Sequence, residues 1–230
     1  MTDKDFFERR QKAQEQINRI DRDTLETEPQ RDKFFDAVYR QAEGDAAMVP
    51  WADMAAKHKL RNWLLDNPGK GKRAVDVGCG LGDNAEALAK AGYQTTGFDF
   101  SKDAIDWAKQ RFPKSGVTYQ TADLFDLPEE WSGAFDLVHE CYTLQSIPPE
   151  TLEKTIPATA NLVAPNGILL LYARVREDGQ TADGPPWPVE KSKLQEFAMH
   201  GLTLENMDEF SVERQDRSIP HYFMVWRRTS

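Results

Sequence analysis

A glycine-rich turn between a short apolar run and a helix-forming segment is the first place in this chain where chemistry can be located. Residues 74–82 read Ala-Val-Asp-Val-Gly-Cys-Gly-Leu-Gly, so glycines alternate at positions 78, 80 and 82. Glycine lacks a Cβ atom and tolerates left-handed dihedrals, so a ligand can lie against this backbone. A second apolar run ends in Asp99, an acid that can accept hydrogen bonds from two ribose hydroxyls. Together the turn and the acid predict a site for a nucleoside-containing cofactor.

The spacing of the glycines and a further acid distinguish between such cofactors. A dinucleotide fingerprint is G-x-G-x-x-G, in which a helix N-terminus faces a pyrophosphate. Here the spacing is G-x-G-x-G, position 83 is an aspartate, and Asp76 lies two residues before the first glycine. A carboxylate at that position suits an ammonium group better than a phosphate. S-Adenosylmethionine (SAM) has an ammonium group and a ribose and lacks phosphate, so the pattern favours SAM.

Residues 75–82 resemble the first motif of the class I SAM-dependent methyltransferase superfamily. Later segments resemble that superfamily in the expected order: residues 121–124 the adenine-contacting motif, residues 135–140 the fourth strand, and residues 162–167 the turn before the fifth. The aromatic segment that ends at Trp51 is similar to that of small-molecule enzymes of the thiopurine methyltransferase type, which act on thiols and other soft nucleophiles. The resemblance implies methyl transfer to a small molecule, with O- or N-methylation as the alternative.

Alternating strand and helix patterns predict an α/β fold with a doubly wound, Rossmann-like sheet. The resemblance adds that the sheet has seven strands, is mostly parallel with an antiparallel C-terminal strand, and carries helices on both faces. Strands are expected at residues 73–77, 94–99, 117–122, 134–140, 167–174, 203–213 and 219–228. Helices are expected from Trp51 to the Asn-Pro-Gly stop at 67–69, and at residues 83–91, 102–112, 150–163 and 189–200. Pro157 should kink or split the fourth of these helices, and Gly201 should end the fifth.

Length and composition predict one folded domain with an N-terminal extension. A chain of 230 residues with 40% hydrophobic content can bury one sizeable core. Residues 1–33 contain eight basic and nine acidic residues and a narrow apolar stripe, which is typical of a solvated amphipathic helix. We therefore expect a helical arm at residues 1–33 and a SAM-binding methyltransferase domain at residues 34–230. The arm either packs loosely on the sheet edge or is a lid that orders when the cofactor binds.

Charge and hydropathy disfavour several other classes of protein. The net charge of −9 argues against nucleic acid as a partner, because duplex binding needs a basic face. We find no apolar run long enough to span a membrane, and the first residues lack the apolar core of a signal peptide. The two cysteines have no metal-ligand spacing, so we expect no metal site. These features predict a cytoplasmic protein that acts on a small molecule, and they leave its oligomeric state open.

The predicted cofactor site lies where ligands of open α/β sheets bind, outside the carboxyl ends of the strands. The resemblance implies that Asp76 faces the amino acid end of SAM, Asp99 the ribose and Asp123 the adenine amine. Asp123 has an alternative role as a turn cap. The predicted cofactor-binding residues are Trp51, Asp76, Gly78, Cys79, Gly80, Gly82, Asp99, Phe100, Ala122, Asp123, Leu124 and Glu140.

The predicted acceptor site is formed by residues that follow the fourth and fifth strands and by the N-terminal aromatic cluster. Tyr142 and Arg174 are the candidate catalytic residues. The candidate substrate-binding residues are Tyr39, Gln145, Arg176 and Trp187. We expect His139 to be a core histidine rather than a base, and His221 to be structural. Two other classes stay open: a nicotinamide-dependent oxidoreductase and a non-catalytic binding protein with the same fold.

Overall fold

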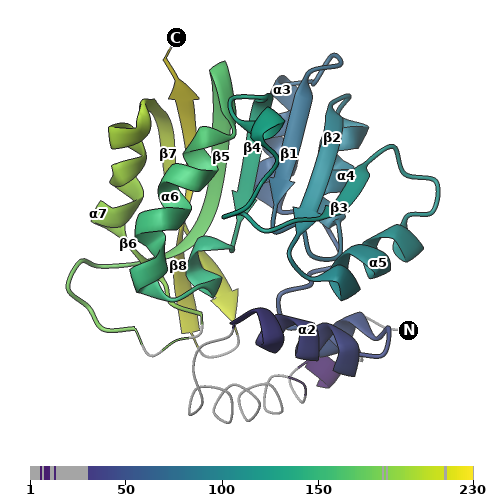
Figure 1. Cartoon of the computed structure of the whole chain (residues 1–230). Coiled ribbons are helices and arrows are strands. Elements are labelled where there is room, and N and C mark those ends of the chain that lie inside the picture. Colours follow the sequence, from purple (N-terminus) through teal and green to yellow (C-terminus); the bar gives the residue numbers. More distant parts are fainter. Residues whose placement is uncertain are drawn as a thin grey trace.

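The computed structural model describes residue 6, residues 8–10, residue 13, residues 31–182, residue 184, residues 186–214 and residues 217–229. Most of the predicted arm at residues 1–33 therefore lies outside the described residues. The remainder forms one twisted sheet with helices on both faces, as predicted (Figure 1). In Figure 1, α6 and α7 lie in front of the sheet, and α3 and α4 lie behind it.

The five parallel strands follow the predicted apolar runs. Their bounds are β1 Arg73–Val77, β2 Gln94–Asp99, β3 Thr118–Thr121, β4 Phe135–Cys141 and β5 Val163–Arg176. The sheet order is β3-β2-β1-β4-β5-β8-β7. From β1 the chain builds outward through β2 to β3, and it then returns to place β4 on the other side of β1. Open α/β sheets bind ligands where the strand order reverses in this way, which here is between β1 and β4. β5 begins four residues earlier than predicted, because Val163 already pairs with Phe135 before the register shifts.

The sheet contains eight strands, one more than the seven predicted, and the extra strand lies in its C-terminal half. β7 (Leu202–Arg214) and β8 (Arg217–Arg228) are antiparallel to each other, and β8 is also antiparallel to β5, as predicted. The extra strand is β6 (Val189–Glu190), which pairs in parallel with the end of β5. The predicted helix at 189–200 is therefore wrong at its start. It is replaced by β6, a single helical turn α7 (Lys191–Leu194) and the 3-10 helix η5 (Gln195–His200), which ends at Gly201 with a φ of 78°.

The helices that follow the strands confirm the remaining predictions, with two corrections. Their bounds are α2 Arg31–Gln41, α3 His58–Asp66, α4 Asp83–Lys90, α5 Lys102–Arg111 and α6 Leu152–Asn161, with 3-10 turns at Ala46–Met48, Glu129–Trp131, Leu144–Ser146 and Pro149–Thr151. α3 begins at His58 rather than near Trp51, because Met54 has a left-handed φ of 57° that a helix cannot contain. α6 runs through Pro157 without being split.

Apolar side chains cover both faces of the sheet, as a buried parallel sheet requires. Val75 and Val138 pack with Ile156 of α6 on one face, whereas their neighbours Ala74 and Leu137 pack with α3 and α4 on the other. Each fully buried side chain of this kind stabilises the fold by about 1.5–3 kcal/mol. This packing holds the carboxyl ends of β1, β2 and β4 at one edge, and α2 lies beyond that edge in Figure 1.

Candidate functional site

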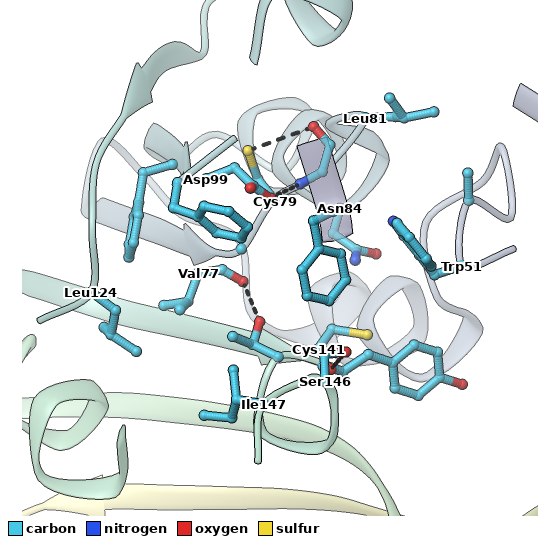
Figure 2. Close-up of a pocket in the computed structure, with 18 of the residues that line it drawn as sticks. Trp51, Val77, Cys79, Leu81, Asn84, Asp99, Leu124, Cys141, Ser146 and Ile147 are labelled. Atoms are coloured by element: carbon cyan, nitrogen blue, oxygen red, sulfur yellow. Dashed lines mark hydrogen bonds between the residues drawn. The ribbon is translucent and has the colours of Figure 1, made fainter. Parts of the chain in front are cut away.

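A cleft of about 490 Å³ opens at the carboxyl ends of the parallel strands, which is within the size range of small-molecule sites. Figure 2 shows Asp99 and Cys79 along one wall, Ser146 and Ile147 along the facing wall, and Trp51 and Leu124 at the two ends. The predicted site residues that line this cleft are Tyr39, Trp51, Gly78, Cys79, Gly80, Asp99, Phe100, Ala122, Asp123, Leu124 and Tyr142. Eleven positions chosen from sequence thus meet in one place.

The glycine turn needs glycine for its backbone and for its close neighbours. Gly78, Gly80 and Gly82 all have positive φ, at 61°, 50° and 88°. A Cβ atom at Gly78 would lie 2.5 Å from the hydroxyl oxygen of Thr143, which donates a hydrogen bond to the carbonyl of Val77. Any side chain there would displace the loop after β4. The turn therefore joins the ends of β1 and β4, and Gly82 stands behind it as the cap of α4.

Asp99 is tied to the glycine turn by hydrogen bonds to its carboxylate. One oxygen accepts from the backbone N–H of Gly80 and the other from that of Ser101, both at 3.0 Å. The side chain is only 6% exposed, yet it lines the cleft. Burial raises the pKa of Asp99 to about 6, and the two amide donors oppose that rise. An oriented carboxylate with lone pairs to spare is thus presented to a ligand.

Two predicted cofactor acids lie in the core behind the cleft instead of lining it. Oδ1 of Asp76 is 2.7 Å from Nδ1 of His139, and both side chains are buried. Oε1 of Glu140 accepts from the backbone N–H groups of Thr143 and Leu144, at 2.7 and 3.1 Å. Burial raises the pKa of Glu140 to about 7. These acids shape the ends of β1 and β4, and the structure does not bring them to the cleft surface.

An aromatic wall closes the cleft on the side of α2. Nε1–H of Trp51 donates to the hydroxyl of Tyr39 at 2.8 Å, which fixes the indole ring. The ring of Phe35 lies 5.2 Å from Trp51 and 5.8 Å from Phe100, so one row of rings runs from α2 to the end of β2. Phe35 belongs to the N-terminal aromatic cluster of residues 34–51, but its contact with Phe100 depends on how α2 packs and has no local sequence signal.

The charges of the cleft lining favour a cation. Five carboxylates line it, and among the described lining residues Lys57 is the single lysine or arginine. Lys57 forms an ion pair with Asp53, and Asp83 forms one with Arg111 at 2.8 Å. The lining acids are Asp53, Asp83, Asp99, Asp123 and Glu150. Asp53 and Lys57 could not be predicted from the sequence, because they lie in an irregular segment that carries no motif.

The remaining predicted acceptor residues lie outside this cleft. Gln145 is buried and acts as a bridge: its side-chain oxygen accepts from the backbone N–H of Arg174 at 2.6 Å, and its carbonyl accepts from that of Trp187 at 2.7 Å. Arg176 and Trp187 line a separate hollow of about 70 Å³. They do so because the loop after β5 turns back to form β6 instead of crossing the cleft. Arg174 contacts the lining residue Tyr142, whose ring centre is 5.5 Å from its guanidinium carbon.

Both cysteines of the chain, Cys79 and Cys141, line the cleft. Burial raises the pKa of both Cys79 and Cys141, which keeps the thiols protonated. Within the described residues, no group of three or more His, Cys, Asp or Glu side chains is arranged to hold a metal ion. The described helices include none with the length and hydrophobicity of a membrane span.

Comparison with known proteins finds a family match for part of this chain. Residues 74–167 match the family described as a methyltransferase domain. A ubiquinone biosynthesis O-methyltransferase of Chromobacterium violaceum is 33% identical over 140 residues, which are 59% of this chain and 58% of that protein. The corresponding protein of Aromatoleum aromaticum is 36% identical over 139 residues, 59% and 57% of the two chains. The chain thus spans less than two thirds of the length of these curated relatives.

Solved structures share the fold at lower sequence identity. A protein of echinomycin biosynthesis has a TM-score of 0.69 and 22% identity over 86% of this chain and 92% of that one. The 1,6-didemethyltoxoflavin-N1-methyltransferase of Burkholderia thailandensis has a TM-score of 0.66 and 19% identity over 85% and 88%. Residues 74–167 thus match a methyltransferase-domain family, and the solved structures share the fold of the chain.

Proposed function

We propose that the protein transfers the methyl group of SAM to a small-molecule acceptor bound in the cleft. The observation that carries this proposal is the position of Asp99. Its carboxylate is oriented by the glycine turn, stands at the carboxyl end of β2 and lines a cavity of ligand size. This is where superfamily members bind the ribose of the cofactor.

The lining has the chemistry that SAM requires. Asp99 accepts one amide hydrogen bond on each oxygen, which leaves lone pairs for the two ribose hydroxyls. The excess of carboxylates favours the positive charges of the sulfonium and ammonium groups, and the faces of Trp51 and Phe35 add cation–π attraction. When bound, SAM supplies a methyl carbon attached to a positively charged sulfur. The chain's own residues have to orient the acceptor and exclude water.

Asp123 is proposed to contact the adenine while it also shapes its own turn. Its Oδ1 accepts from the backbone N–H of Phe125 at 2.9 Å, and the residue lines the cleft. The cap role and the cofactor role considered from sequence are therefore compatible, since a carboxylate has a second oxygen. Ala122 and Leu124 on either side provide apolar surface for the base.

We further propose that the acceptor is a neutral or cationic molecule with an O–H or N–H group. Multiply anionic acceptors would be repelled by the lining acids, because the ammonium group of Lys57 is already paired with Asp53. The relatives named as O-methyltransferases support an O–H acceptor. A thiol or other soft nucleophile, as in the thiopurine methyltransferase branch, is the second candidate. It is supported by the aromatic wall that ends at Trp51.

The alternative classes have less support in the site. A dinucleotide needs a helix N-terminus free to face a pyrophosphate, but Asp83 occupies the first turn of α4 and pairs with Arg111. A binding protein without catalysis would not need an oriented acid at the ribose position. Asp99 and Asp123 are both present at the cleft.

Calorimetry followed by a product assay tests the proposal. We expect S-adenosylhomocysteine (SAH) and SAM to bind with one-to-one stoichiometry and NAD⁺ not to bind. The protein is then incubated with SAM and a panel of phenols, amines and thiols, and the release of SAH is measured. Asp99→Asn should bind SAH at least tenfold more weakly, whereas the matched control Asp106→Asn, on the exposed face of α5, should not. Binding of NAD⁺ in place of SAH would overturn the proposal.

A further inference from the structure

The backbone of Tyr142 adopts an unusual conformation at the edge of the cleft. Tyr142 directly follows the last residue of β4 and has a φ of 71°, in the left-handed region that tyrosine rarely occupies. Its N–H donates to the carbonyl of Tyr172 at 3.2 Å, which fixes this conformation against β5. Strained backbone of this kind persists where a side chain must be aimed at a functional site. Because Tyr142 lines the cleft, its strained backbone points to a role in contacting the bound ligand.

The hydroxyl of Tyr142 forms a hydrogen bond whose direction the structure fixes. It lies 2.9 Å from Nε2 of His221, and Nδ1 of the same imidazole lies 2.8 Å from the carbonyl oxygen of Ile219. A carbonyl only accepts, so Nδ1 carries the hydrogen. Nε2 of the neutral ring is then an acceptor, and the hydroxyl of Tyr142 donates to it. A buried histidine thus stands ready to receive the tyrosine proton.

Two cations lie against the ring of Tyr142. Nζ of Lys57 is 4.2 Å from the ring centre of Tyr142, and the guanidinium of Arg174 packs against the same ring. On the side of the ring where Lys57 lies, the acidic group is Asp53, which forms an ion pair with Lys57. Burial raises the pKa of Tyr142, and the positive charge of Arg174 opposes that rise.

The surroundings of the imidazole itself are mainly aromatic. It is stacked on Phe210 at 5.4 Å and lies 5.6 Å from Tyr172, while Arg174 is its partner across β5 and β8. Nζ of Lys59 lies 4.8 Å from the ring centre of Phe210 and pairs with Asp208.

We propose that Tyr142 accepts a hydrogen bond from the reacting O–H or N–H of the methyl acceptor, and that His221 is the positioning residue which takes the tyrosine proton. This inference rests on the proposed function. A lone pair of the acceptor atom bonds to the methyl carbon as the methyl–sulfur bond breaks, and that electron pair stays on sulfur. The acceptor's proton moves to the oxygen of Tyr142, and the proton of Tyr142 moves to Nε2 of His221. The resulting imidazolium later releases its proton to water.

His139 and four of the five lining carboxylates are placed for other roles. His139 lies behind the cleft with its Nδ1 against Asp76, and it does not line the cavity. Among the lining carboxylates, Asp99 and Asp123 stand at the predicted cofactor end, Asp53 and Asp83 form ion pairs, and Glu150 has no contact with Tyr142 or His221 among those described. Tyr142 is the described lining residue whose side-chain oxygen leads directly to a histidine.

Nuclear magnetic resonance of the ligand-free protein tests the pair without any assay of activity. The chain has four histidines, so substitution of each assigns its nitrogen signals. We expect His221 at pH 8 to be protonated on Nδ1 and bare on Nε2, and Tyr142→Phe to shift the Nε2 signal. A protonated Nε2, or a signal that Tyr142→Phe leaves unchanged, would overturn the proposal.

Kinetics with paired acceptors test the proton transfer. His221→Gln keeps an oxygen that can accept from Tyr142 but cannot take its proton. For a phenol that is un-ionised at the assay pH and that the wild type methylates, His221→Gln and Tyr142→Phe should each lower kcat by at least tenfold. For a nitrophenol that is already ionised, the two variants should retain kcat within about threefold. His200→Gln, at the end of η5, is the matched control and should leave both rates unchanged.

The outcomes separate this inference from the proposed function. Equal losses on both phenols, or no loss on the un-ionised one, would remove the proton-accepting role while methyl transfer by the wild type still stands. Failure of the wild type to bind SAH would instead remove the proposed function. If His221→Gln does not fold, as judged by thermal melting, Tyr142→Phe carries the same test because it removes one hydroxyl from a half-buried ring.

Discussion

Asp76 and His139 face each other on neighbouring strands, with Oδ1 of the acid 2.7 Å from Nδ1 of the imidazole. They are register partners of β1 and β4, and each residue is at most 1% exposed. The other polar atoms of the pair, Oδ2 and Nε2, are buried and have no hydrogen-bond partner among the described residues. The acid that the motif assigns to the amino group of SAM is thus the partner of a core histidine, so its structural role can be tested separately from cofactor binding.

Asp76→Ala should destabilise the protein by about 3 kcal/mol or more, because it leaves a buried imidazole without its partner. Asp76→Asn should cost only about 1 kcal/mol, since the amide oxygen still accepts from Nδ1–H. Urea unfolding followed by circular dichroism measures both values. Asp106→Ala, on the exposed face of α5, is the control. A folded Asp76→Asn of unchanged stability that binds SAH more than tenfold more weakly would return Asp76 to the cofactor.

The affinity for SAH should depend on the ionisation of Asp99. Burial raises the pKa of this carboxyl to about 6, and ribose hydroxyls donate to the ionised form. Binding should therefore be full above pH 6 and weaken as the pH falls through 6, by about tenfold for each further pH unit. Calorimetry between pH 5 and 8 measures this, with circular dichroism to show that the fold survives. Asp99→Asn should lose the pH dependence, and a flat profile in the wild type would exclude ionised Asp99 as the contact.

The strands and the cofactor turn could be predicted because their signals are local. β1 and β2 have the predicted bounds, since an apolar run bounded by polar residues and glycines specifies a buried parallel strand. The spacing of the three glycines and of Asp99 is typical of a turn in which a ligand lies against the backbone. All of these are short-range patterns, and the superfamily resemblance orders them in the sheet.

The missed features depend on contacts that join distant residues. His139 lies 63 residues from Asp76, and His221 lies 79 residues from Tyr142, so no periodic pattern reveals either pair. The polar loop before Trp187 predicts this residue at the acceptor, but its backbone N–H donates to the carbonyl of Gln145, two residues before β6 begins. Tertiary packing overrode local pattern in each case.

Glu140→Gln should change how stability depends on pH. The pKa of Glu140 is about 7 in the folded protein and 4.5 for an ordinary glutamate, so the folded state binds the proton more tightly. Stability from this group is therefore full below about pH 4.5 and is lost as the pH rises through about 7. That difference in pKa corresponds to about 3 kcal/mol. Urea unfolding at pH 5 and pH 8 should show Glu140→Gln gaining roughly that amount relative to the wild type at the higher pH. A constant difference at both values would mean that the buried carboxyl does not titrate in this range.

The N-terminal arm should respond to the cofactor through Asp53. The guanidinium of Arg10, in the predicted arm, is 3.1 Å from Oδ1 of Asp53, and Asp53 lines the cleft and pairs with Lys57. A ligand that fills the cleft orders Asp53, and so should strengthen the attachment of the arm. Hydrogen–deuterium exchange should show residues 1–30 more protected with SAH than without it. Asp53→Asn should reduce that difference, whereas Asp106→Asn should preserve it. Equal protection in the two states of the wild type would leave the arm as a static element that packs on the sheet edge.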